Sequence, residues 1–294
     1  MEKSSEFQEA TQLCEQAKAA MAGGKTRFFF FTDKPDYQEA SDLFNRAGNL
    51  FKTVKAWRES GDAFFEAAKC DKLNGEPEEA ARRLISAASC FKKVEPTRAI
   101  EALCEAITVF LHAGRFHLAA SHEKEVAEIY ESLDDFKNAM DFYARASERY
   151  SAEDSKATAL SCQLKAGNLA AVVGEYGRAA GIFEEIIKAW AGDDLKRYSM
   201  KDYFTRHGLC MLCSGDLVGA RREIAGYPSV DHNITTTSEY KLLMGVLEAL
   251  EENDLERFDE EVGNFNSVGL LDDWRTKMLL RLKKTITDED ESLA

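Results

Sequence analysis

The segments Phe136-Lys137-Asn138-Ala139 and Tyr176-Gly177-Arg178-Ala179 begin forty residues apart, and each places an aromatic residue three positions before an alanine. Three residues are nearly one helical turn, so the ring and the methyl group share one face of a helix. A small side chain beside a large one lets a neighbouring helix approach closely. Alanines return at this spacing in two series, Ala40, Ala80, Ala120 and Ala99, Ala139, Ala179. Such a repeat is typical of stacked helix pairs, and it predicts an all-α solenoid.

Apolar helical stretches alternate with short polar breaks between residues 37 and 190. The breaks include Asn74-Gly75-Glu76-Pro77, Glu95-Pro96, Gly114, Asp134-Asp135 and Gly174. Short connections predict antiparallel neighbours. After Trp190 the rhythm is irregular, with helices predicted over 195–217, 220–227, 239–252, 255–265 and 274–285. We therefore predict a tetratricopeptide-like (TPR-like) solenoid over 1–190, a C-terminal helical bundle over 191–286 and an acidic tail over 287–294; a further amphipathic helix is expected over 2–22.

Composition excludes several classes of protein. The 294-residue chain has a formal net charge of −14, which opposes general binding to nucleic acid. It contains no apolar stretch long enough to span a bilayer, and residues 1–10 lack the apolar core of a signal peptide. Seven cysteines lie inside helical patterns and lack the spacing of a disulfide framework. We expect a cytoplasmic protein with reduced cysteines.

No catalytic or metal-binding pattern is supported by its context. Residues 19–26, AAMAGGKT, loosely match a phosphate-binding loop, but that loop requires a preceding strand, and these residues follow a helical pattern. Cys210 and Cys213 have the spacing of a metal half-site without further ligands nearby, so two helix cysteines is the favoured interpretation. The five histidines are scattered along the chain. We predict a protein that is not an enzyme and holds no cofactor or metal.

Four consecutive phenylalanines, Phe28, Phe29, Phe30 and Phe31, stand between helix breakers and are flanked by Lys25, Arg27 and Lys34. One interpretation is a loop that folds back and buries its rings. The other is a tip that enters the interface of an anionic membrane while the cations meet the head groups. Two acidic segments, 248–254 and 288–291, are either solvated surfaces or docking sites for a basic protein.

Several segments together resemble the soluble NSF attachment proteins of the α/β type. The most specific are 196–204 (KRYSMKDYF), 271–274 (LDDW) and 278–286 (MLLRLKKTI). Supporting segments are 49–52 (NLFK), 114–116 (GRF), 127–130 (AEIY) and the acidic end with its penultimate leucine. The resemblance covers nearly the whole chain. It implies a twisted, right-handed superhelical array of antiparallel helices followed by a C-terminal helical bundle.

The resemblance also implies partners. Several copies of such an adaptor, each a monomer when alone, surround a SNARE four-helix bundle and present it to the hexameric AAA+ ATPase NSF. The matching SNARE-binding positions are Arg115, Lys165, Leu195, Tyr198 and Lys201. Ser121 and Ser161 occupy two positions that are usually basic, and Lys124 is expected to compensate if it faces the same surface. The matching NSF-binding positions are Asp216, Glu248, Glu251, Glu252, Asp288, Glu289, Asp290, Glu291 and Leu293.

The membrane-contacting loop of the family matches Phe28–Phe31, which favours the second interpretation of that run and a peripheral location on the cytosolic face of membranes. Two other functions stay open. One is a TPR-like scaffold for another trafficking complex without coupling to NSF. The other is an enzyme that uses AAMAGGKT to bind nucleotide, which failure of the purified protein to bind ATP would exclude.

Overall fold

The structure, a computed structural model, describes residues 5–23, 34–191, 197–269 and 271–293, without the side chains of residues 197–198 and 288–293. Over these ranges the chain forms α-helices and one short 3₁₀ helix (Ile234–Thr236) and no strand, so the all-α prediction is confirmed. The helices are α1 (Ser5–Ala22), α2 (Tyr37–Thr53), α3 (Trp57–Leu73), α4 (Pro77–Phe91), α5 (Pro96–His112), α6 (Phe116–Ser132), α7 (Phe136–Ala152), α8 (Lys156–Val172), α9 (Tyr176–Trp190), α10 (Arg197–Cys213), α11 (Leu217–Val230), α12 (Ser238–Glu252), α13 (Leu255–Val268) and α14 (Asp273–Leu293).

The chain forms two compact units. The first unit comprises residues 1–134 and 145–156, and the second comprises residues 135–144 and 157–294. The first therefore contains α1 to α6 and the second half of α7, while the second contains the first half of α7 and α8 to α14. The domain boundaries predicted from sequence, after residues 190 and 286, stay predictions.

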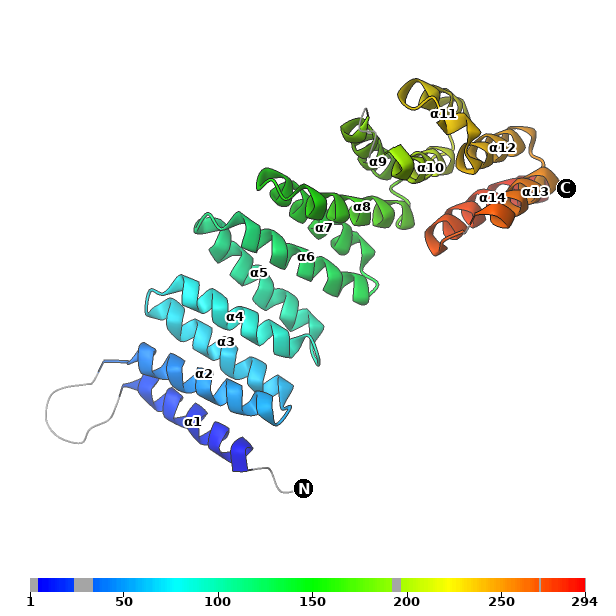
Figure 1. The fold of residues 1–294 in the computed structure, drawn as a ribbon. Helices are drawn as coiled ribbons and strands as arrows, with labels where there is room; N and C mark the ends of the chain where they lie inside the picture. Colours follow the sequence, from blue (N-terminus) through cyan, green and yellow to red (C-terminus); the bar gives the residue numbers. More distant parts are fainter. Residues whose placement is uncertain (1–4, 24–33, 192–196, 270, 294) are drawn as a thin grey trace, which may run out of the picture. The chain divides into compact units, whose positions relative to one another are not determined.

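In the first unit, α1 to α6 form a row in which each helix packs against the next and runs back along it (Figure 1). The repeating alanines explain this close packing, because Ala40, Ala80 and Ala99 are fully buried. Glycine has the same role at one contact: a Cβ added to Gly61 in α3 would lie 2.4 Å from the ring of Phe91 in α4. Small and large side chains therefore fit together between adjacent helices, as the repeat predicts.

The helix ends repeat as regularly as the helix interiors. A residue with left-handed backbone follows the last turn at Gly75 and Gly114 and again at Asp134 and Gly174. At the three glycines, the amide of the next residue donates to the carbonyl five residues before it, as Glu76 does to Asp71 at 2.8 Å. This arrangement satisfies a carbonyl that the helix leaves free and stops the helix. The predicted breaks at these positions are confirmed, and Pro77 and Pro96 begin α4 and α5, where a missing N–H is harmless.

In the second unit, α10 packs against α9, α11, α12 and α14. The sequence prediction of one helix over 195–217 is wrong, because α10 ends at Cys213 and a turn through Gly215, whose φ is 85°, separates it from α11. The predicted end of α11 at Tyr227 is also too early. The helix continues through Pro228 to Val230, since a proline in the last turn removes only one backbone hydrogen bond.

Candidate functional site

Two of the predicted basic binding residues lie in the first unit, and both form ion pairs there. Arg115, which precedes the first turn of α6, donates to a carboxylate oxygen of Glu78 at 2.7 Å. The ammonium nitrogen of Lys124 lies 3.9 Å from Glu128, one turn along the same helix. Ser121 is exposed three positions before Lys124, so the two residues share a face of α6. Lys124 therefore lies on the same face of α6 as Ser121, and its compensation for the serine stays a prediction.

The other two predicted basic binding residues that the structure describes, Lys165 and Lys201, lie in the second unit. Lys165 is exposed on α8. Lys201 in α10 forms an ion pair of 2.9 Å with Glu239, in the first turn of α12. Glu239 is buried. Burial alone would raise the pKa of its carboxyl, but hydrogen bonds from Lys201, from its own backbone amide and from Ser238 outweigh that effect and lower the pKa. Glu239 is thus held as a carboxylate by the lysine that we expect to bind a partner.

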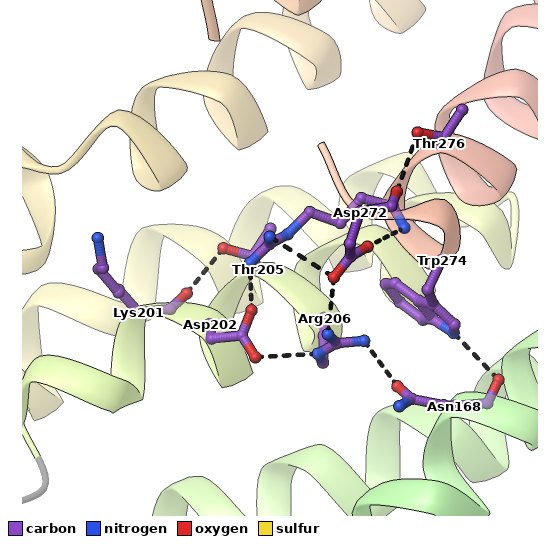
Figure 2. Close-up of polar contacts among 9 residues, drawn as sticks. Asn168, Lys201, Asp202, Thr205, Arg206, Asp272, Trp274 and Thr276 are labelled. Carbon is purple, nitrogen blue, oxygen red and sulfur yellow. Dashed lines mark hydrogen bonds and ion pairs between the residues drawn. The ribbon is translucent and has the colours of Figure 1, made fainter. Parts of the chain in front are cut away.

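A polar network follows Lys201 along α10. The guanidinium of Arg206 donates to Asp202 at 3.1 Å, to the side-chain oxygen of Asn168 in α8 at 2.7 Å, and to Asp272 at 3.0 Å (Figure 2). Asp272 also accepts from the backbone amide of Arg275 at 2.7 Å, so it caps the first turn of α14. One buried arginine therefore connects α8 and α10 to the start of α14.

Two further residues attach α14 to α8. The indole of Trp274 donates to the backbone carbonyl of Asn168 at 3.0 Å (Figure 2). Arg281 donates to the carbonyls of Ala171 and Val172 at 2.7 and 2.5 Å. These carbonyls are at the C-terminal end of α8, where the helix dipole favours a cation, and that of Ala171 also accepts from the backbone amide of Gly174 at 3.1 Å. The position of α14 is therefore set by directional bonds as well as by apolar packing.

The predicted acidic positions gather around the last turns of α12, and arginines bind most of them. Arg221 in α11 donates to Glu251 at 2.8 Å, and this hydrogen bond lowers the pKa of Glu251. Arg257 in α13 donates to Glu252 at 2.6 Å and to Glu248 as well. Asp216 instead caps α11, since its carboxylate accepts from the amide of Gly219 at 2.9 Å. We call Asp216, Glu248, Glu251 and Glu252 the acidic cluster.

A cavity of about 210 Å³ lies beside the acidic cluster. The end of α10, the end of α12 and the middle of α14 form its walls, through Leu212, Leu250, Leu282 and Ile286. Cys213 also faces it, and burial raises the pKa of this thiol to about 12. Burial raises the pKa of Cys210 too, so both thiols are protonated and unreactive at neutral pH. The interpretation of this pair as helix cysteines is consistent with their surroundings.

Comparison with known proteins assigns the family. A family model described as "Soluble NSF attachment protein, SNAP" matches residues 8–287. The chain belongs to this family. It is 34% identical over 295 residues to the Alpha-soluble NSF attachment protein of Homo sapiens, with 100% of both chains covered. It is 35% identical to the Beta-soluble NSF attachment protein of Bos taurus, with 99% of this chain and 98% of that protein covered. The same identity, 35%, relates it to a Probable vesicular-fusion protein sec17 homolog of Neurospora crassa, over 96% of this chain and 98% of the relative.

The two sequence segments on which the family resemblance chiefly rests, 196–204 and 271–274, meet in the polar network. Asp202 comes from the first segment, and Asp272 and Trp274 come from the second. Their contacts join residues up to 106 positions apart, which local sequence patterns do not predict. Sequence reasoning also missed the partners of the predicted charges, namely Glu78, Glu239, Arg221 and Arg257.

Several predicted positions of the family's binding sites lie outside the described structure. They are Phe28, Phe29, Phe30, Phe31 and Leu195, together with the side chains of Tyr198, Asp288, Glu289, Asp290, Glu291 and Leu293. The backbone from Asp288 to Leu293 continues α14. Among the residues that the structure describes, no three His, Cys, Asp or Glu side chains gather as a metal site would require, and no helix is long and apolar enough to cross a membrane.

Proposed function

We propose that this chain is an adaptor in vesicle fusion and intracellular protein transport. It binds assembled SNARE complexes, recruits an NSF-type AAA+ ATPase and stimulates it to take those complexes apart. The chain itself catalyses no reaction in this scheme and uses no cofactor. The observation that carries the proposal is the match of the family model to residues 8–287, supported by relatives that align over their full length.

The charges of the described residues support the SNARE-binding half of the proposal. The family resemblance implies a SNARE bundle with a largely acidic surface. A net charge of −14 alone disfavours such a partner, so binding must depend on local cations. In the proposal these are Arg115, Lys124, Lys165 and Lys201, joined by Leu195 and Tyr198. The chain is a monomer when alone, and several copies bind one SNARE bundle.

The acidic cluster supports the NSF-binding half. Arg221 and Arg257 pair with Glu248, Glu251 and Glu252 and offset part of their negative charge, and Asp216 adds a fourth carboxylate. The acidic cluster therefore keeps more negative than positive groups, and a partner that presents basic residues can exchange with its part-exposed ion pairs at low cost. The end of α14, with Asp288 to Glu291 and Leu293, continues the acidic surface in this proposal, and Leu293 stimulates ATP hydrolysis.

The location that we propose is cytoplasmic and peripheral on the cytosolic face of membranes. Phe28 to Phe31 enter the bilayer interface while Lys25 and Arg27 contact anionic head groups. Replacement of the four phenylalanines by serine is expected to slow SNARE disassembly on liposomes and to spare it in detergent. Equal losses in both settings would mean that the run has a structural role instead.

A pull-down experiment tests the central proposal. An immobilised, assembled SNARE bundle should retain this chain, and NSF should join only when the chain is present. Retention without recruitment of NSF would favour a scaffold of another trafficking complex. A truncated chain that lacks Leu293 and Ala294 is the matched variant: it should bind the bundle as the full chain does but stimulate ATP hydrolysis less. Unchanged stimulation would contradict the role of Leu293.

A further inference from the structure

Three of the predicted SNARE-binding cations form ion pairs within the chain before any partner arrives. Arg115 pairs with Glu78, Lys124 with Glu128 and Lys201 with Glu239. The side chains of Glu78 and Glu128 are 41% and 47% exposed, whereas that of Glu239 is only 10% exposed. Exposed pairs exchange easily with water and contribute little. The pair of Lys201 and Glu239 is therefore the one whose rupture has a cost.

The surroundings of Glu239 determine that cost. Its carboxylate is bound by Lys201 at 2.9 Å and by the hydroxyl of Ser238 at 3.0 Å. It also lies in the first turn of α12, where the helix dipole favours a negative charge. When Lys201 leaves, the serine and the helix end remain, but the buried charge loses its only described cationic partner. A buried carboxylate without that partner is destabilised, so Glu239 opposes the release of Lys201 to a partner.

We propose that Glu239 is an internal competitor that determines which partners can engage Lys201. This inference rests on the proposed function, because it takes Lys201 as a contact of the SNARE bundle. The Lys201 side chain is 33% exposed, and drawing its ammonium outward to a partner carboxylate weakens its attraction to Glu239. A single anion gains little by that exchange. A surface that presents several acidic residues at once, and engages other cations of this chain, gains enough elsewhere to complete it. Glu239 thereby lowers affinity and raises selectivity for densely acidic partners.

The test is the affinity of the full chain for a soluble, assembled SNARE four-helix bundle, measured by calorimetry at physiological salt. Glu239→Gln preserves the shape of the side chain and removes its charge. We expect this variant to bind about three- to tenfold more tightly, because Lys201 no longer breaks a charged hydrogen bond. Glu128→Gln is the matched control: it removes an equal charge from a loose, exposed pair, and should change affinity by about twofold or less.

A double-mutant cycle separates competition from long-range charge. If Glu239 acts through Lys201, the gain from Glu239→Gln disappears when Lys201→Met is also present. Equivalently, Lys201→Met weakens binding more in the Glu239→Gln protein than in the wild type. The comparison of Glu239→Gln with the double variant avoids an unpaired buried carboxylate, so it is informative even if Lys201→Met alone unfolds. Melting curves verify that the compared proteins are folded.

Several results would overturn the inference. A gain that persists without Lys201 would show a general charge effect and would overturn the inference. Unchanged or weaker binding by Glu239→Gln would overturn it as well. Failure of the wild-type chain to bind the bundle at all would overturn the proposed function together with this inference, whereas wild-type binding without the expected gain overturns this inference alone.

Discussion

In the first unit, the stabilising contacts form mainly between helices that are consecutive in the chain. In the second unit, polar bonds also join residues that are far apart in the sequence. Gly61 meets Phe91 across adjacent helices, as each repeat meets the next. Arg206, in contrast, bonds to Asp272, 66 positions away, and Trp274 bonds to Asn168 across 106 positions. One chain therefore uses two means of positioning helices. Shape complementarity repeats easily, while directional bonds define single, non-repeating positions.

Phe91→Ala should break the first kind of contact with the largest effect. Phe91 is fully buried, so truncation leaves a cavity and should lower the free energy of unfolding by about 3–5 kcal/mol. Urea denaturation measures the loss, and hydrogen exchange should place it in α3 to α5. Leu73→Ala, at an exposed site in the same unit, is the control and should have little effect. Faster exchange confined to α10 and α14 would contradict local stabilisation of the first unit.

Arg206→Met should break the second kind of contact. The variant keeps the aliphatic bulk but loses three side-chain hydrogen bonds, and we expect a loss of about 1–3 kcal/mol, because Asp202 and Asp272 are partly solvated and keep Arg275. Exchange should accelerate in α8, α10 and α14. Arg222→Met, which removes an exposed arginine of the same unit, serves as the control. If both variants lose equal stability, the polar network contributes no more to the stability of the second unit than an exposed arginine does.

His207→Gln should give a smaller effect that depends on pH. The Nδ1 of His207 lies 2.6 Å from the hydroxyl of Tyr227, and burial lowers the pKa of this histidine, although Glu184 and Glu223 oppose the shift. The folded state therefore binds fewer protons than the unfolded state. The stability that neutral His207 contributes is present above its unfolded pKa of 6.5 and is lost as the pH falls toward the folded value.

The measurement for His207 is the change in Tm between about pH 7.5 and about pH 5.5. We expect Tm to fall less in the variant than in the wild type, because the variant lacks the proton uptake on unfolding. His232→Gln removes an exposed histidine of the same unit and should keep the wild-type pH dependence. An unchanged pH dependence in His207→Gln would assign the acid sensitivity to other groups.

Lys69→Ala in the first unit and Lys283→Ala in the second should have the smallest effects. Each lysine forms an exposed ion pair, with Glu66 at 2.6 Å and with Asp259 at 2.7 Å. Such pairs contribute about 0.5 kcal/mol or less, and we expect equal, salt-sensitive losses in urea denaturation. The two units would then differ in how their interiors are stabilised, while their exposed ion pairs would contribute equally little to stability. A loss in Lys283→Ala as large as that in Arg206→Met would erase this distinction.

Sequence patterns predicted the structural features that recur along the chain and missed those that occur only once. The alanine series identified buried positions in helices, because one residue type recurs wherever two helices must approach. Helix ends were predictable where glycine adopts the left-handed conformation, as at Gly114. Lys55 and Asp154 end helices in the same way without a glycine to mark them. The turn after Cys213 was missed although Ser214-Gly215-Asp216 carries two signals, a glycine at the left-handed position and an aspartate that caps α11.

The candidate site also combines features that the sequence predicted with features that it did not. Residue type and family resemblance located its charges, but pairing depends on which helices meet. Glu239 and Lys201 are 38 positions apart, and the ion pair exists only because α10 packs against α12. Arg221 and Glu251 meet through the contact of α11 with α12. Long-range packing therefore decides which charges are available to a partner.

The left-handed helix ends have a consequence for engineering. Lys55, Asp134 and Asp154 adopt φ values of 57–58° at exposed positions, a conformation that costs a residue with a side chain about 1 kcal/mol relative to glycine. Lys55→Gly or Asp154→Gly relieves that strain at the cost of a more flexible unfolded chain. A heat-tolerant form of the protein can therefore be sought at its turns, with every charge of the candidate site left as it is.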